Sequence, residues 1–411
     1  MKKKIVIGPI EIAGNVHALY KALNLIGEDC SIFLTRPHPH HAPICVAQKL
    51  HMFASKIQFS IIRKLFRLGI YFIEYLIAVY YIATKDIFIF YFGSTFLPFY
   101  LDLKILRFLN KKCFMVYCGA DSRFPLIDGA RLSNLDEKEA VMVSNVIIKR
   151  LRVVEKYCDG IISNPFSSQL HDKKIINFLV LGLPYFINEF QKKKLMTTKK
   201  IKVLHAPSNT LAKGSKKIKS IVDELAKIYS IEYIELKGVP HSEVAEKIIE
   251  SDIVIDQLYC DVPLAGLATE ALSYGKPVFV GSYVTHENMQ RFLDIKFDFV
   301  IFHHPDRLKE TLTYYLENPD KLNELVANGQ TYVDKYLKPE LIAKRWQKVL
   351  YNQLSADWII NPKLVKYPFG AGISKSFLKK RLKDLNIDFS KINLSDEHYL
   401  IQELKKLQGV N

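Results

Sequence analysis

The sequence predicts an α/β protein built from two doubly wound domains that face each other across a cleft. The chain has 411 residues, which is too long for one ordinary core. Short apolar segments alternate with helical patterns along most of it, as in parallel sheets covered on both faces. A polar, lysine-dense stretch at 188–202 interrupts this alternation near the middle, as an inter-domain linker would.

The first half contains five candidate strands separated by helical patterns. The expected strands are 4–10, 30–35, 86–92, 113–118 and 160–164. The helical patterns lie at 15–26, 56–83, 99–110 and 137–157. This order predicts one parallel sheet with helices on both faces.

The second half repeats the alternation. We expect strands at 201–206, 231–236, 252–258 and 277–281, and helices at 215–229, 241–250 and 264–274. A further helix is expected at 338–354, and a basic amphipathic segment at 374–385. The predicted division is an N-terminal domain at 1–186, a linker at 187–200, a C-terminal domain at 201–337, a helix at 338–355 and a basic tail at 356–411.

Charge and cysteine usage narrow the class of protein. The formal net charge of +16 and the pI near 9.3 indicate an acidic partner, such as nucleic acid, anionic lipid or a phosphorylated small molecule, unless the source proteome is simply lysine-rich. No nucleic-acid-binding motif is present and the lysines are spread over both halves, so we expect no nucleic-acid partner. Six scattered cysteines are typical of reduced thiols in the cytoplasm, and the first apolar run, ending at Pro9, is too short for a signal peptide.

A candidate phosphate site follows the expected strand at 201–206. The sequence there is "APSNTLAKGSKKI", in which Ser208 and Asn209 can cap a helix and Gly214 permits a tight turn. Lys213 stands beside a helix N-terminus, which already favours an anion. The alternative is a solvated lysine in a polar turn.

A second candidate site follows the expected strand at 252–258. Gly266 allows the backbone to approach a ligand, and Glu270 lies one turn into the next helix. A carboxylate in that place can accept hydrogen bonds from a ribose diol. The alternative is a carboxylate that only compensates the helix dipole.

These segments together carry a resemblance. "HAPSN…KG", "GVPHSEVAEKIIESDIVIDQL" and "GLATEALSYGKPV" over 203–281 resemble the C-terminal domain of GT-B glycosyltransferases of the retaining group called family 4 or group 1. "EIAGNVHALYKALNLIG", "DIFIFYFGS" and "MVYCGADSR" resemble the N-terminal domain more loosely. The resemblance covers most of 1–355 and implies two Rossmann-like domains. The first would lie on the acceptor side, the second would bind the nucleotide-sugar, and the helix at 338–355 would cross back to the first.

The resemblance also implies site residues. Lys213 would neutralise the donor diphosphate, and Glu270 would hold the ribose. Donor binding is assigned to Gly14, Asn15, Gly119, Ser208, Asn209, Lys213, Gly266, Leu267 and Glu270. Catalysis is assigned to Lys213, Asp121 and Arg123.

The chain departs from the family pattern at three points. Val262 stands eight positions before Glu270, where the family has a second Glu, and Asp261 is the nearest carboxylate. The arginine that often precedes the Lys-Gly pair is absent from "SNTLA". Cys118 replaces the histidine that often ends the strand before Gly-x-Asp. A sub-branch lacking the first Glu reads Gly-Gly-aromatic, and "AGLATEA" lies closer to it.

The implied activity is transfer of a sugar from a nucleotide-sugar donor to a glycan or lipid-linked acceptor, in bacterial surface polysaccharide or glycoconjugate synthesis. The nucleotide-sugar is substrate, no cofactor is expected, and without an Asp-x-Asp motif no metal is required. Catalysis would rest on positioning and on stabilisation of phosphate charge, each contact contributing about 2–4 kcal/mol. The alternatives are an inverting GT-B transferase and a non-catalytic GT-B protein that binds a sugar nucleotide or a partner transferase.

Two further segments leave alternatives open. "RPHPHHAP" at 36–43 could hold a metal through His38, His40 and His41, although a rigid proline-rich loop accounts for it better. The apolar segment 61–84 contains Glu74, so we do not expect it to span a membrane. It fits either a helix on an anionic membrane surface, with the basic tail as a second contact, or a buried helix. The expected location is cytoplasmic, with peripheral attachment to the inner membrane face under the first alternative.

Overall fold

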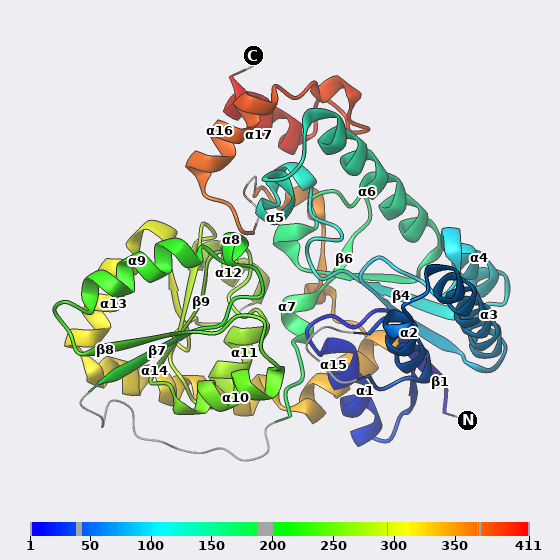
Figure 1. Cartoon of the computed structure of the whole chain (residues 1–411), viewed down its shortest axis with the longest axis horizontal. Helices are drawn as coiled ribbons and strands as arrows, with labels where there is room; N and C mark the ends of the chain where they lie inside the picture. The colour runs from blue at the N-terminus through cyan, green and yellow to red at the C-terminus, as the bar shows by residue number, and fades with distance from the viewer. Residues whose placement is uncertain are drawn as a thin grey trace.

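The computed structural model describes residues 2–37, 43–186, 200–293, 295–367, 369 and 371–409. It contains two α/β domains, each built on its own largely parallel sheet (Figure 1). The predicted fold class, two doubly wound domains facing a cleft, is confirmed. The predicted linker at 187–200, except residue 200, lies outside the described residues. The histidines of the 36–43 loop also lie outside them.

The N-terminal sheet has seven strands in the order β12-β6-β5-β4-β3-β1-β2. All neighbours are parallel except β12 and β6, which pair antiparallel. Every residue of β3 is buried, as expected for a central strand covered on both faces. The strands are β1 Lys4–Gly8, β2 Asp29–Ile32, β3 Ile87–Tyr91, β4 Lys112–Val116, β5 Gly160–Ser163, β6 Ile175–Asn177 and β12 Ile359–Ile360.

Helices of the N-terminal domain connect these strands. Those of eight residues or more are α1 Asn15–Leu25, α2 Val46–Lys56, α3 Ser60–Thr84, α4 Leu101–Phe108 and α6 Glu137–Tyr157. The short ones are α5 Gly129–Leu132 and α7 Phe178–Leu181. A capping box between Asp136 and Glu139 starts α6.

The C-terminal sheet has five parallel strands in the order β11-β10-β9-β7-β8. They are β7 Ile201–His205, β8 Ile231–Glu235, β9 Ile253–Cys260, β10 Val278–Ser282 and β11 Ile301–His303. The helices are α8 Thr210–Lys213, α9 Ser215–Leu225, α10 His241–Glu250, α11 Gly266–Ser273, α12 His286–Leu293, α13 Leu308–Glu317 and α14 Pro319–Tyr332. Both the site segments at 206–218 and 260–270 therefore follow carboxyl ends of strands, where ligands of such sheets bind.

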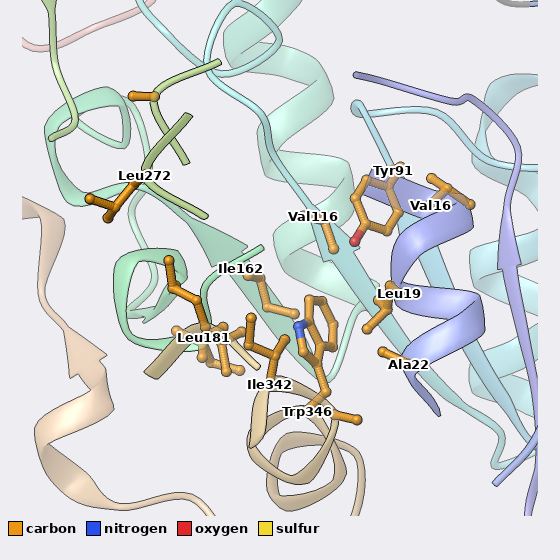
Figure 2. Packing of buried hydrophobic residues seen from close by; sticks show 14 of the residues in the cluster. Val16, Leu19, Ala22, Tyr91, Val116, Ile162, Leu181, Leu272, Ile342 and Trp346 are labelled. Atoms are coloured by element: carbon orange, nitrogen blue, oxygen red, sulfur yellow. The ribbon is translucent and has the colours of Figure 1, made fainter. Parts of the chain in front are cut away.

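The chain returns to the N-terminal domain through α15, Pro339–Leu350. Trp346 of α15 is 1% exposed and lies against Leu19 and Ala22 of α1, with Ile162 of β5 beside it (Figure 2). The Glu28 carboxylate accepts two further hydrogen bonds, one from the Gln347 side chain in α15 and one from the Tyr351 hydroxyl just after it. The helix is therefore part of the N-terminal core.

The segment predicted as a basic tail is folded. Its helices α16, Lys375–Leu385, and α17, Tyr399–Gln408, pack beside α6 at the top of the molecule in Figure 1. Leu378 and Leu382 are buried in the N-terminal core, and the Arg381 guanidinium donates to two main-chain oxygens of the 132–135 turn. Residues 371–372 connect the domains, because Gly129 N donates to Ala371 O and Gly372 N donates to Tyr259 O.

Some predicted elements were wrong in extent. The helical pattern at 56–83 begins at Ser60 instead, since Ile57 and Phe59 adopt extended backbone between α2 and α3. Strands β6, β11 and β12 were not predicted, because each has only two or three residues.

Candidate functional site between the domains

A buried carboxylate lies at the centre of the candidate site. Glu270, in α11, is 6% exposed. Its carboxylate lies 3.1 Å from Nε2 of His241, the first residue of α10. This hydrogen bond raises the pKa of His241, because the neighbouring carboxylate favours the imidazolium. The pair can therefore offer both an acceptor and a cation to a polar ligand.

Two adjoining cavities meet at this pair. One has a volume of about 360 Å³ and the other about 380 Å³, and both are lined by Ala13, Tyr185, His241 and Glu270. Such volumes fall in the range of small-molecule sites. Ala13 belongs to the N-terminal domain and Glu270 to the C-terminal domain, so the site lies between them.

Six predicted donor-binding residues line these cavities. Ser208, Gly266, Leu267 and Glu270 line the smaller one, together with Gly238 and Val239 of the turn after β8. Gly14 and Asn15 line the larger cavity.

Tyr185 joins the two walls. Its hydroxyl donates to Gly266 O at 2.9 Å, and burial raises its pKa strongly. A Cβ added at Gly266 would stand 3.3 Å from that hydroxyl and 4.0 Å from Ala13 Cβ. A side chain at position 266 would therefore press on the Tyr185 hydroxyl.

Lys213 does not line either cavity. Its Nζ lies 2.8 Å from Oδ1 of Asp256, which is fully buried in β9. The lysine charge is thus already balanced by a carboxylate of the same domain. Asn209 is likewise engaged, because its side chain caps α8 by accepting from Ala212 N.

The loop before α1 is occupied by an internal anion. Glu11 is buried, and its carboxylate accepts hydrogen bonds from Val16 N at 3.1 Å and His17 N at 3.0 Å. These are the free amides that a phosphate beside Gly14 would use. Burial raises the pKa of Glu11, which opposes its charge, while the amide bonds favour it.

Asp121 lies at the carboxyl end of β4. Its carboxylate accepts from Cys118 N at 2.9 Å, and burial raises its pKa to about 7. A carboxyl group with that pKa exchanges protons near neutrality. Gly119, with φ of 121°, makes the turn that leads to it, and neither residue is among those that line the two cavities.

Arg123 connects the two domains through a buried ion cluster. Its guanidinium pairs with Asp128 at 3.1 Å and with Asp261, after β9, at 2.5 Å. All three side chains are at most 7% exposed. Asp261, the carboxylate nearest to the missing first Glu, is therefore committed to the domain interface.

Comparisons with known proteins agree with this fold. Residues 226–350 match the sequence profile of a family described as glycosyl transferase-like. A crystal structure of HepE from Anabaena in complex with UDP-glucose has a TM-score of 0.50 to this chain at 11% identity, covering 86% of this chain and 100% of HepE. The chain has the GT-B fold.

A glycosyltransferase from Rickettsia africae aligns over 86% of this chain and 99% of its own, with a TM-score of 0.48 and 13% identity. No curated protein matches the sequence. The GT-B resemblance seen in the sequence is confirmed for the fold.

In this GT-B chain several residues that contact the predicted site residues were not predicted from the sequence. They are Glu11, Asp256, Tyr185 and His241. His241 could have been found, since it follows Gly238-Val239-Pro240 after β8, at the same sheet edge as Glu270. Asp256 lies 43 residues from Lys213, and no local pattern connects them.

Two further observations concern metal binding and a second candidate cavity. Within the described ranges no three His, Cys, Asp or Glu side chains gather as a metal site would require. A wider cavity of about 860 Å³ opens around β11, α13 and α14, but only residues of the C-terminal domain line it.

Proposed function

We propose that the chain transfers a sugar from a nucleoside diphosphate donor and binds that donor between its domains. The observation that carries the proposal is the buried Glu270 beside His241, where cavities lined by both domains meet. A carboxylate held there can accept both hydroxyls of a ribose. The glycosyl transferase-like match at 226–350 supports the same ligand class.

The donor is proposed to lie along the smaller cavity. The base would occupy the part lined by Gly238 and Val239, and the ribose would bind Glu270. HepE, which shares the fold, was crystallised with UDP and with UDP-glucose, which makes uridine nucleotides the first to test. The diphosphate would then reach the Gly266 and Ser208 side, where Leu267 also lies.

For the chemistry we propose transfer with retention and without a divalent metal. The bond between the anomeric carbon and the donor phosphate oxygen breaks, the acceptor oxygen forms the new glycosidic bond, and the proton of the acceptor hydroxyl passes to the leaving diphosphate. Negative charge grows on the leaving diphosphate, so cations near it lower the barrier. Lys213 is the proposed cation, shared with Asp256, and we propose Asp121 and Arg123 as the catalytic residues of the N-terminal domain.

The donor site is tested with one variant and one matched control. Glu270→Gln keeps the size of the side chain but weakens the acceptor, so we expect UDP or UDP-sugar affinity to fall at least tenfold by calorimetry. Glu246→Gln changes an exposed acid on α10 and should leave that affinity unchanged. Equal affinity in wild type and Glu270→Gln would contradict the assignment.

A second candidate is a GT-B protein that binds a sugar nucleotide without transferring the sugar. It is favoured by the charge pairing of Lys213 with Asp256 and of Arg123 with two carboxylates. A panel of UDP- and GDP-sugars separates the two. A transferase releases nucleotide with acceptor or slowly with water, whereas a binding protein shows only thermal stabilisation.

We further propose a glycan or lipid-linked acceptor, a place in bacterial surface polysaccharide or glycoconjugate synthesis, and a cytoplasmic location. The family resemblance and the reduced cysteines support these assignments. An inverting reaction is the competing stereochemistry, and the anomeric configuration of the product, read by NMR, distinguishes the two.

A further inference from the structure

Helix α3 presents an apolar surface to solvent. Its residues Ile61, Leu65, Leu68, Phe72 and Leu76 are between 50% and 72% exposed. Other exposed apolar or aromatic residues of the helix are Ile62, Tyr71, Ile73, Tyr75, Val79 and Tyr80. Among the residues that the structure describes, a patch of this size has the character of an interaction surface.

The opposite face of α3 holds the helix on the domain. Ile70, Ala78 and Ile82 are buried, and Glu74 pairs with His51 of α2 at 2.9 Å. Figure 1 shows α3 at the outer edge of the N-terminal domain, away from the C-terminal domain. The exposed surface is thus fixed in direction and points away from the protein.

Helix α2 extends the surface toward the candidate site. Val46, Met52 and Phe53 are between 38% and 66% exposed, and the Phe53 ring packs on Phe66 of α3 at 5.5 Å. Ile44, just before α2, is 40% exposed and lines the larger of the two site cavities. We call the exposed apolar residues of 44–80 the α2–α3 apolar face.

Charge on this face has one sign. Lys64 and Arg67 are exposed near the start of α3, and Arg63 is half-buried beside them. The single acid of α2 and α3 is Glu74, which is turned inward to His51. With a net charge of +16 over the chain, the face is complementary to an anionic surface.

We propose that the α2–α3 apolar face docks on an anionic lipid bilayer, with α3 lying in the interfacial plane. The 25-residue helix is roughly 37 Å long and is apolar enough in composition to cross a membrane, with 17% of its most apolar window buried in the protein. Because its inner face is packed on the domain, α3 binds along the surface and buries only its outer side. Phe and Tyr side chains are suited to that depth.

A bilayer fits this face better than a second copy of the chain does. Two copies meeting through α2 and α3 would bring no acid to Arg63, Lys64 and Arg67, since these helices hold only the inward Glu74. Anionic headgroups would satisfy those cations. The face also ends at Ile44, so an acceptor held in the bilayer would meet the protein beside the site cavity.

The test is flotation of the full chain with vesicles of phosphatidylcholine alone or with 30% phosphatidylglycerol, at low and high salt. We expect binding to the anionic vesicles that weakens with salt. The double variant Leu68→Gln/Phe72→Gln should reduce the bound fraction at least tenfold, and Lys64→Gln/Arg67→Gln should remove the preference for anionic lipid. The control Ile228→Gln alters a residue 73% exposed in the C-terminal domain and should bind like wild type.

Absence of binding at low salt, or equal binding by wild type and Leu68→Gln/Phe72→Gln, overturns the proposal. A concentration-dependent dimer, measured by light scattering and abolished by the same double variant, would identify a second copy as the occupant instead. Nucleotide affinity, measured by calorimetry, should be the same in this variant and in wild type. The failure of membrane docking is therefore distinguishable from failure of the proposed function.

Discussion

At the scale of single residues, the candidate site is a set of charges that are mostly paired within the protein. Glu270 pairs with His241, Lys213 with Asp256, and Glu11 with main-chain amides of α1. A donor must therefore exchange contacts rather than fill free ones. A bound nucleotide would replace the hydrogen bond between Glu270 and His241, so nucleotide affinity reports on this pair directly.

Asp121 gives a prediction about pH. Its pKa is raised from the ordinary aspartate range to about 7 by burial. Between pH 4 and 7 the folded state holds a proton that the unfolded chain has released, so the free energy of unfolding falls as pH rises. Asp121→Asn carries no charge and should raise that free energy by about 1–3 kcal/mol at pH 8.5.

Urea unfolding followed by circular dichroism checks this prediction. At pH 4.5 the gain should vanish, since the wild-type carboxyl is protonated there. Asp136→Asn, at the exposed cap of α6, serves as a contrast, because it should destabilise at both pH values by loss of a cap. A gain for Asp121→Asn that is equal at both pH values would show that burial of the charge is not its cause.

At this scale the sequence suggested candidate site residues but not the residues that pair with them. Glu270 and Gly266 were predicted because they follow a strand end and open a helix, which is a local pattern. His241 is 29 residues from Glu270, and Asp261 is 138 residues from Arg123. The pairing of such residues depends on how strands are ordered in the sheets, which one sequence does not encode locally.

At the scale of elements, several long helices were predicted well, whereas α2, α13 and α14 and the shortest strands were not predicted. Helices α1, α6 and α10 match the predicted ranges to within one residue at each end. Strands β6, β11 and β12 are too short to show a period, and their positions depend on pairing with neighbours. Helix α3 was located, but its exposed apolar face is the reverse of the amphipathic pattern expected of a covering helix.

Helix α15 gives a stability prediction. Trp346 is 1% exposed and packs against α1 and the sheet. Trp346→Ala would leave a cavity at the contact of the returning helix and should cost about 3–5 kcal/mol of stability. Trp346→Phe fills more of the space and should cost less. The midpoint of urea unfolding measures both.

A small loss for Trp346→Ala, comparable with that of the phenylalanine variant, would show that α15 is not a fixed part of the N-terminal core.

At the scale of the whole molecule, the two domains are joined by buried polar contacts as well as by the chain. Arg123 of the N-terminal domain lies between Asp128 of the same domain and Asp261 of the other. The pairing raises the pKa of Arg123, so the cation persists. The resemblance assigned Arg123 to catalysis, whereas its contacts indicate a role in fixing how the domains meet.

This cluster predicts an asymmetry between two variants. Arg123→Met leaves two buried carboxylates without their cation and should cost about 3–5 kcal/mol. Asp261→Asn leaves the Arg123–Asp128 pair intact and should cost about 1–2 kcal/mol. Equal losses in urea unfolding would contradict the assignment of Arg123 as the shared cation.

The bridge at residues 371–372 has a consequence for motion. Ala371 accepts from Gly129 in one domain and Gly372 donates to Tyr259 in the other, both through the main chain. A Cβ added at Gly129 would lie 1.7 Å from Gly372 O, and a Cβ added at Gly372 would lie 2.8 Å from Ala212 Cβ. No larger side chain therefore fits at either glycine. A rotation that widens the site must therefore turn about an axis close to this point, or else break the Gly372–Tyr259 bond. We therefore expect the C-terminal segment to act as a pivot for any rotation that separates the domains at Glu270 and Ala13.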